Sequence, residues 1–295
     1  MNKYILCIIA VFLCQRSLSQ DATILSKDAR GNEKMLGIIT KQGLTSNSFN
    51  SWFTPNFEAY EPNEQIIKKL RRKLKKHTLT IFMGTWCGDS KREVPRFYKI
   101  LEATGFPQDK LRVIGLNNER DSYKQGPNHE EKGFDIHRVP TFIVFDQKGK
   151  EIGRIVEHPV ESLEADLLKI CRKKPYEHSY QIVTQLQQLI EKKGITHITN
   201  HITEIVTHLQ PYAKSLKELN TYGYVLLRAK EIDKAITVFT INTHLFPKNK
   251  NSYDSLAEAY YEAHNFQAAQ KYYRKVLDID PNDQNAQKML SQIEK

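Results

Sequence analysis

A short apolar run that leads directly into a cysteine and then into a helical pattern is the strongest constraint in this sequence. Residues 79–83 are apolar apart from one threonine and predict a buried strand, whereas residues 91–101 predict a helix. Between them lies the stretch Trp86-Cys87-Gly88-Asp89-Ser90. A thiol at a helix start faces unpaired backbone N–H groups and the positive end of the helix dipole, and both favour the thiolate. We therefore expect Cys87 to be nucleophilic.

The residues around this stretch alternate between strand and helix patterns. Helices are expected over residues 65–76 and 162–171, the second with Ser162 as its N-cap. Strands are expected over residues 110–116, 142–145 and 151–156. Such alternation predicts an α/β sheet with helices on both faces.

Positive charge is concentrated in one of the expected helices. The chain carries a net charge of +10 at pH 7, and seven lysines and arginines lie within residues 68–76, interrupted by Leu70 and Leu74 at helical spacing. We interpret the run as the solvated face of a helix whose leucines pack inward. An anionic membrane or polymer partner is the alternative, and no nucleic-acid motif accompanies the run.

These segments resemble the thioredoxin family over residues 61–172. Thioredoxins carry a Trp-Cys-Gly-Pro-Cys-Lys motif, a proline later in the same helix, and a cis-proline loop that faces the active cysteine. Here the motif, the helix proline and the loop are matched by Trp86, Cys87, Gly88 and Lys91, by Pro95, and by Val139-Pro140-Thr141. The resemblance implies a cis peptide bond before Pro140 and substrate binding by Val139, Pro140 and Thr141, with backbone groups of Val139 pairing with a substrate strand.

Three positions depart from the thioredoxin pattern. Ser90 stands where the second, resolving cysteine belongs, Asp89 replaces the proline, and Ile81 occupies the position of a buried aspartate. In the usual cycle the first thiolate attacks a disulfide and the second thiol releases the mixed disulfide, so this chain performs only the first step alone. Ser90 can donate a hydrogen bond to the thiolate, and Asp89 has two opposite effects, since its carboxylate suits the helix dipole but opposes the charge of a nearby thiolate. The candidate catalytic residues are Cys87, Ser90, Trp86 and Asp89.

The other cysteines do not replace the missing thiol. Cys7 and Cys14 fall in the N-terminal leader, and Cys171 lies nine residues beyond Ser162. In a thioredoxin-like sheet that last helix begins at the active-site end, so Cys171 is about 13–14 Å further along it. A disulfide needs Cα atoms less than about 7 Å apart. We expect Cys171 to be a packed core thiol.

The first twenty residues have the form of a secretory signal peptide. Lys3 precedes an apolar core over residues 4–13, and polar and small residues follow. This core is too short to span a bilayer stably. We expect cleavage and an exported protein, periplasmic or extracellular. A lipoprotein anchored through Cys14 and an uncleaved membrane anchor are the alternatives.

Residues 21–60 are expected to form an irregular N-terminal extension. Glycines and a Ser/Asn cluster are followed by Phe49, Trp52, Phe53, Phe57 and Tyr60. We expect these aromatic side chains to pack on the next domain, and a ligand-binding use of the cluster is the alternative.

Beyond residues 173–175 the strand patterns stop and a 34-residue period begins. The pairs Gly223/Ala257, Ala235/Ala269, Phe239/Tyr273 and Pro247/Pro281 are each separated by 34 residues. This period resembles the tetratricopeptide (TPR) repeat. Because about three repeats are needed for a stable stack, we expect residues 179–192, 195–209 and 284–294 to complete it as degenerate or capping helices. The resemblance implies a partner-binding face that includes Asn220, Tyr224, Arg228, Asp254, Glu258 and Tyr261.

Histidines recur within the helix expected over residues 195–209. His197, His201, Glu204 and His208 fall on one face of that helix. Two histidines four residues apart can ligate a transition metal, but chance spacing on a solvated face explains them as well, and no HExxH arrangement accompanies them. We therefore assign no metal site.

The sequence thus predicts a signal peptide (1–20), an extension (21–60), an α/β thioredoxin-like domain (61–174) and an all-α TPR domain (178–295). The first interpretation is thiol–disulfide redox chemistry, in which Cys87 forms mixed disulfides with a client protein, an external thiol resolves them, and the TPR domain selects the client. The second is a non-catalytic adaptor that uses the cis-proline groove and the TPR face. The third is a structural domain in which Trp86 and Cys87 are relics. We expect no cofactor and no nucleic-acid partner.

Overall fold

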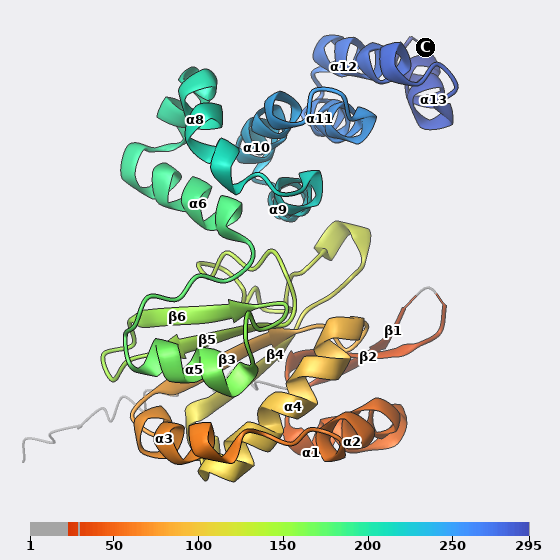
Figure 1. The fold of residues 1–295 in the computed structure, drawn as a ribbon. Helices are drawn as coiled ribbons and strands as arrows, with labels where there is room; N and C mark the ends of the chain where they lie inside the picture. The colour runs from red at the N-terminus through yellow and green to blue at the C-terminus, as the bar shows by residue number, and fades with distance from the viewer. Residues whose placement is uncertain (1–22, 29, 295) are drawn as a thin grey trace, which may run out of the picture.

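The computed structural model describes residues 23–28 and 30–294 and contains an α/β part followed by a helical part (Figure 1). The expected signal peptide over residues 1–20 lies outside the described residues. Within the described ranges, no helix combines the length and the apolar character needed to cross a membrane.

A six-stranded mixed sheet organises the α/β part. Its strand order is β1-β2-β4-β3-β5-β6; the β3/β4 pair is parallel, and the other four described pairs are antiparallel. The strands are β1 (Ile24–Lys27), β2 (Glu33–Ile38), β3 (Thr78–Met83), β4 (Leu111–Gly115), β5 (Thr141–Phe145) and β6 (Glu151–Val156). The central β3 matches the predicted buried strand, and β5 and β6 form the predicted hairpin.

The expectation of an irregular N-terminal extension is wrong. Strands β1 and β2 form a hairpin, and β2 adds to the edge of the sheet by pairing with β4. The Asp28 carboxylate accepts hydrogen bonds from the N–H groups of Arg30 and Asn32, and Gly31 has a φ of 82°, so the turn is closed locally. Short helices follow: α1 (Lys41–Leu44), η1 (Asn47–Phe49) and α2 (Asn50–Glu58).

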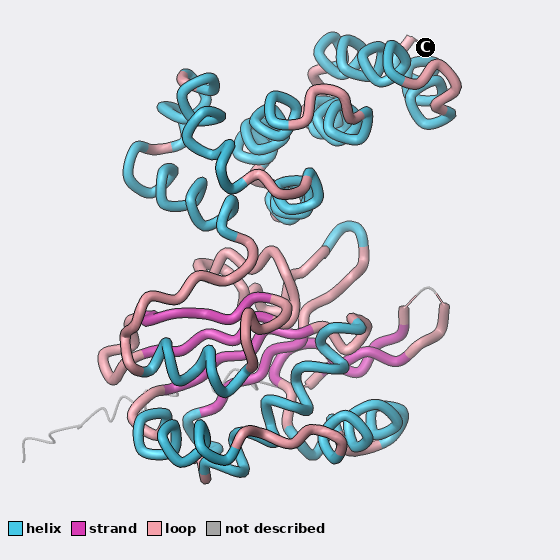
Figure 2. Tube along the Cα trace, viewed as in Figure 1, coloured by secondary structure: helices cyan, strands magenta, loops and turns pink. Residues whose placement is uncertain are grey.

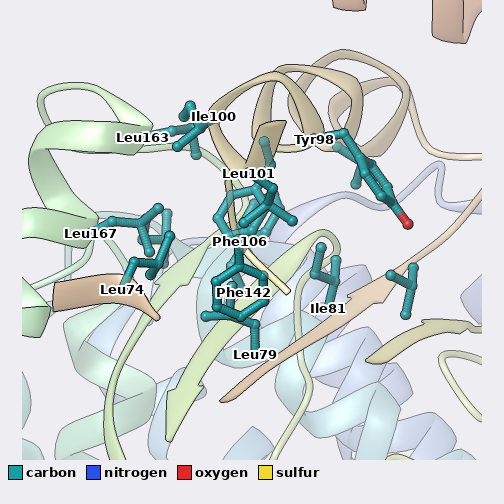
Figure 3. Close-up of a cluster of buried hydrophobic side chains, with 14 of the residues drawn as sticks. Leu74, Leu79, Ile81, Tyr98, Ile100, Leu101, Phe106, Phe142, Leu163 and Leu167 are labelled. Carbon is teal, nitrogen blue, oxygen red and sulfur yellow. The ribbon is translucent and has the colours of Figure 1, made fainter. Parts of the chain in front are cut away.

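Helices cover one face of the sheet. They are α3 (Glu64–Leu74), α4 (Gly88–Thr104) and α5 (Leu163–Cys171), with α2 beside α4. Figure 3 shows how side chains from α4 and α5 meet Leu79, Ile81 and Phe142 of the sheet. The predicted packing of the N-terminal aromatic residues is confirmed, since Phe49 and Phe53 are buried in the same core. Likewise α3 buries its leucines and leaves its basic residues exposed, which confirms the solvated face.

Within the described residues, the opposite face of the sheet carries no such helices, so the expectation of helices on both faces is wrong. Phe82, Ile114 and Ile143 pack there against Ile136 and Val139. The last two belong to the segment 117–140, which connects β4 to β5 and is irregular except for η3 (Arg120–Ser122). Figure 1 shows the yellow-green chain between β4 and β5 passing between the strands and the helical part, and Figure 2 shows that most of it is loop.

The helical part is a stack of antiparallel helices. Its elements are α6 (Gln181–Lys193), α7 (Ile195–Asn200), α8 (Ile202–Leu209), η4 (Gln210–Tyr212), α9 (Leu216–Arg228), α10 (Ile232–Leu245), α11 (Lys250–Glu262), α12 (Phe266–Ile279) and α13 (Gln284–Ile293). The expected single helix over residues 195–209 is wrong, because the backbone of His201 leaves the helical region and separates α7 from α8. The ring Nδ1 of His201 forms a hydrogen bond with the carbonyl of His197 at 2.9 Å.

The 34-residue register places a glycine where α9 and α10 cross. A Cβ on Gly223 would lie 2.5 Å from the ring of Phe239, which is fully buried. Contacts that short do not occur between packed carbon atoms, so the crossing requires glycine at this position.

We predict that Gly223→Ala lowers the free energy of unfolding by about 1–3 kcal/mol, because overpacking a filled core forces side chains off their rotamers. Urea unfolding measures the loss. The same substitution in a Phe239→Leu background should cost less, since the smaller side chain makes room. An equal cost in both backgrounds would show that the close approach is not the cause.

Candidate functional site

Cys87 lies at the junction of β3 and α4, where the sequence places it. It is the N-cap residue of α4, and its carbonyl accepts the helical hydrogen bond from Lys91 N–H at 3.0 Å. The side chain is half-buried. Its Sγ donates to the backbone carbonyl of Val139 at 3.3 Å, and the Val139–Pro140 peptide bond is cis, as predicted.

Trp86 and Thr141 complete the surroundings of the thiol. The indole Nε1 of Trp86 donates to the carbonyl of Leu116 at 2.7 Å, which fixes the ring on the end of β4. The hydroxyl of Thr141 donates to the carbonyl of Arg138 at 2.7 Å and closes the turn that contains Pro140. The structure thus brings Trp86, Cys87, Val139, Pro140 and Thr141 together, although they come from distant parts of the chain.

The hydroxyl of Ser90 does not make the hydrogen bond to Cys87 that the sequence suggests. Its side chain is fully buried, and among the described residues its hydroxyl has one hydrogen bond, accepted from the N–H of Gly84 at 3.2 Å. Within the residues that the structure describes, no hydrogen bond therefore joins Ser90 to the sulfur of Cys87. Ser90 instead links the first turn of α4 to the end of β3.

The charge of Asp89 is paired with an arginine. Its carboxylate pairs with the guanidinium of Arg92 at 2.7 Å on the surface of α4. Arg92 also contacts the buried carboxylate of Glu93 at 2.7 Å. Because an arginine neutralises Asp89, the opposition to a Cys87 thiolate is weaker than the sequence alone implies.

Charged residues that sequence reasoning missed contact the chain that leads into Pro140 or belong to it. Lys124 is buried, and its Nζ donates to the carbonyl of His137 at 2.6 Å. Arg138 pairs with Glu157 at 3.2 Å. No spacing marks these residues in the sequence, because they lie in the segment 117–140 and in the loop after β6. Only the immediate proximity of Arg138 to the cis-proline could have drawn attention to it.

Cys171 is a core thiol, as predicted. It ends α5, its side chain is 9% exposed, and it packs in the main hydrophobic core. Burial raises the pKa of the Cys171 thiol to about 12, so the thiol is neutral at physiological pH. It forms no disulfide among the described residues.

The predicted partner-binding face is arranged around two glutamates of α11. Tyr224 of α9 donates to Glu258 at 2.8 Å, and the guanidinium of Arg228 binds both Glu258 and Glu262. Asp254 accepts a hydrogen bond from Asn285 at 2.8 Å, and the ring of Tyr261 packs edge-on against Phe266. Asn220 and Tyr224 line a cleft of about 260 Å³ together with Tyr123 of the α/β part.

This face is already engaged by the α/β part of the same chain. Arg120 of η3 donates to Glu258 at 2.7 Å and to Glu262 at 3.3 Å. Lys34, a buried residue of β2, holds the beginning of the segment that carries Arg120. Its Nζ donates to Asn117 at 2.7 Å and to Glu119 at 2.6 Å. Two arginines, one from each part, therefore share one pair of glutamates.

The histidines of α7 and α8 do not converge on a metal. The rings of His197 and His201 stack with centroids 4.0 Å apart, and Glu204 pairs with Lys193 at 2.9 Å. Within residues 23–28 and 30–294, no group of three histidine, cysteine, aspartate or glutamate side chains is placed to hold a metal ion.

We predict that iodoacetamide at pH 8 modifies Cys87 and spares Cys171. With a pKa of about 12, only about one Cys171 side chain in ten thousand is a thiolate at that pH, and the thiol is also shielded. Peptide mapping by mass spectrometry gives the two extents of reaction. Modification of Cys171 in the native protein at the rate seen in denaturant would contradict its burial.

We predict that Arg120→Ala loosens the contact between the two parts without unfolding either. Because the arginine side chain is 66% exposed, its ion pairs contribute at most about 1 kcal/mol. Amide hydrogen exchange of residues 117–125 and of α11 should become up to about fivefold faster. Arg274→Ala is the matched control, since Arg274 is 64% exposed and pairs within the helical part. Unchanged exchange in Arg120→Ala would show that the contact does not hold the parts together.

Family comparisons agree with this architecture. Residues 53–168 match the family model described as thioredoxin, which begins before the predicted domain start at residue 61, and residues 251–283 match the model described as tetratricopeptide repeat. No curated protein matches the sequence significantly. A crystal structure of a protein of unknown function from Pseudomonas aeruginosa aligns with 42% of this chain and 83% of its own, with 14% identity and a TM-score of 0.32. The chain therefore joins a thioredoxin-like domain to a C-terminal TPR domain.

Proposed function

We propose that this protein carries out thiol–disulfide exchange through Cys87 as a single nucleophilic thiol and binds a protein partner through its TPR domain. One observation carries the proposal. The half-buried sulfur of Cys87 lies at a helix start, 3.3 Å from the carbonyl that precedes a cis-proline, while the position of a resolving thiol is filled by the buried Ser90. A site of this kind can capture a sulfur partner.

The exchange proceeds in two displacements. The Cys87 thiolate attacks one sulfur of a client disulfide, a new sulfur–sulfur bond forms, and the other client sulfur leaves as a thiolate that takes up a proton. A thiolate from a small thiol or a second protein then attacks the mixed disulfide and releases Cys87. The second step needs an external thiol because Cys171 is buried in the core and has its pKa raised to about 12.

The cis-proline loop is the proposed binding site for the client backbone. Val139 lies directly beside the thiol, and Thr141 begins β5. A client strand that paired with the backbone of Val139 would bring its sulfur to Cys87. The side chain of Trp86, held on the end of β4, would border the same strand.

The TPR domain is the proposed selector of the client. Its face presents Asp254, Glu258 and Tyr261 on α11, and Glu258 is shared with Arg120 of the thioredoxin-like domain. A partner that binds Glu258 has to compete with Arg120, so partner binding and domain contact are linked. We also propose export to the periplasm or the cell exterior, on the basis of the signal-like residues 1–20.

An adaptor without redox activity is the second candidate function. The observation that favours it is Ile81, which is fully buried where dithiol thioredoxins carry an aspartate, so no carboxylate is present there to move protons. In that case the cis-proline groove and the TPR face would bind partners without exchange.

We predict that oxidised glutathione forms one mixed disulfide per chain, on Cys87, and that the adduct persists until dithiothreitol is added. Mass spectrometry measures the glutathione adduct on the wild type, Cys87→Ser and Cys171→Ser, and only Cys87→Ser should lose it. In insulin reduction with excess dithiothreitol, the wild type should exceed Cys87→Ser. Equal rates together with no adduct would favour the adaptor.

A variant with a restored second thiol provides a further test of the same proposal. Ser90→Cys places a second thiol in the first turn of α4, so it should release bound glutathione without added reductant by internal attack. Val94→Cys is the matched control, because that position is equally buried in the same helix but lies a further turn from Cys87. Release in both variants, or in neither, would contradict the assignment of Ser90 to the resolving position.

A further inference from the structure

Two glutamates of α11, Glu258 and Glu262, lie one helical turn apart where the TPR domain meets the α/β part. They are four residues apart on the same face of the helix, and each side chain is 21% exposed. Like charges at this spacing repel one another, so the two carboxylates need cations beside them. We call these two residues the glutamate pair.

Arg228 of α9 is the cation that belongs to the TPR fold. Its side chain is 6% exposed, and its two terminal nitrogens bind one carboxylate each. Tyr224 of the same helix donates to the second oxygen of Glu258 at 2.8 Å. One guanidinium against two carboxylates leaves one negative charge. Lys230 approaches Glu262 only to 3.9 Å and is 71% exposed, so water screens most of its effect.

Arg120 supplies a second guanidinium from outside the TPR domain. Its Nη2 donates to Glu258 at 2.7 Å and to Glu262 at 3.3 Å, while the side chain as a whole is 66% exposed. Because Arg228 joins α9 to α11 through the same carboxylates, Arg120 adds a link between the domains and not within the stack. Exposed ion pairs are weak, since water screens them. Arg120 is therefore a replaceable occupant of the glutamate pair.

Two open spaces adjoin Arg120. A cavity of about 770 Å³ is lined by Arg120, the glutamate pair, Tyr261 of α11 and Met289 of α13, and a space of this size accommodates a short peptide segment. The cleft of about 260 Å³ is lined by Arg120 and by Asn220 of α9. The Oδ1 atom of Asn220 is buried, and within the described residues no donor pairs with it. A buried acceptor without a partner is unfavourable, so the cleft favours a ligand that brings N–H donors.

We infer that the glutamate pair is a binding site for an arginine side chain of a partner protein segment, and that Arg120 fills this site in the absence of the partner. The inference rests on the proposed partner binding by the TPR domain and names the chemistry of that partner. A guanidinium carries five N–H donors in a planar fork, so it can bind two carboxylates and an amide oxygen together, whereas a lysine ammonium is a compact point charge. The arginine of the partner replaces Arg120, and Arg228 stays in place because it is buried.

Competition with Arg120 lowers the affinity of the wild type for such a partner. The free protein is divided between a form in which Arg120 holds the glutamate pair and a form in which the pair is open, and the partner binds the open form. An exposed ion pair favours the closed form by a factor of about five or less. Removal of Arg120 therefore increases the affinity by a similar factor.

The test is an NMR titration of the protein with N-acetyl-L-argininamide, in the wild type and in Arg120→Ala. Arg120→Ala should bind this probe about two- to fivefold more tightly, with the largest shifts in α11 and around Asn220 and Tyr224. N-acetyl-L-lysinamide, at the same concentration and ionic strength, should bind Arg120→Ala about threefold more weakly, since it lacks the planar fork. Arg274→Ala is the matched control, because it removes an equally exposed arginine of the helical part, and it should bind as the wild type does.

Substitutions of the glutamate pair provide the second measurement. Glu258→Gln and Glu262→Gln, each combined with Arg120→Ala, remove one charge with little change of shape and should each weaken probe binding about tenfold. If these variants do not fold, the map of shifts in Arg120→Ala decides. The inference would be overturned by equal affinities of the wild type and Arg120→Ala, by equal binding of the two probes, by folded glutamine variants that bind normally, by shifts outside α9 and α11, or by no binding.

The titration separates this inference from the proposed exchange at Cys87, because no sulfur chemistry enters it. Arginine binding without a glutathione adduct would keep the site on α11 and reject disulfide exchange. An adduct without arginine binding would keep the exchange and reject this partner chemistry.

Discussion

The burial of β3 is the constraint on which the rest of the structure depends. This strand pairs with β4 on one side and β5 on the other, and its alternate side chains fill two different cores. Leu79 and Ile81 face the helices, whereas Phe82 faces the segment 117–140. Because both faces are covered, the register of the strand is fixed, and so is the point where it ends. That end delivers Cys87 to the start of α4, and the neighbouring β5 delivers the cis-proline loop to the same edge.

Local signals in the sequence were sufficient for much of this arrangement. The strand before Cys87, the motif residues with Pro140, and the 34-residue spacing of residues such as Gly223 and Ala257 each reflect short-range geometry, and each was predicted. The hairpin of β1 and β2 was not, because its place in the sheet depends on pairing with β4, far along the chain. The break at His201 and the burial of Lys124 likewise depend on tertiary contacts that no periodicity records.

The two domains contact each other through several side chains, so they are not two separate units, one for chemistry and one for binding. Arg120 and Arg228 come from different domains and bind the same pair of glutamates. Arg138, next to the cis-proline, also approaches the carbonyl of Lys217 at the start of α9, at 3.4 Å. Contacts of the segment 117–140 with the TPR domain thus include both the TPR face and a residue next to the cis-proline. The segment 117–140 links the two domains, since it carries both Arg120 and Arg138.

The burial of Ser90 in place of a thiol also decides how such a site would respond to its surroundings. A dithiol that closes on itself releases two small thiols for each disulfide consumed, so its oxidation depends on the square of the small-thiol concentration and increases on dilution. A single thiol exchanges one for one. The fraction of Cys87 held as a mixed disulfide with a small thiol would follow the ratio of disulfide to thiol alone, whatever their total concentration. With Ser90 at that position, the protein would report the composition of a thiol pool and be indifferent to its size.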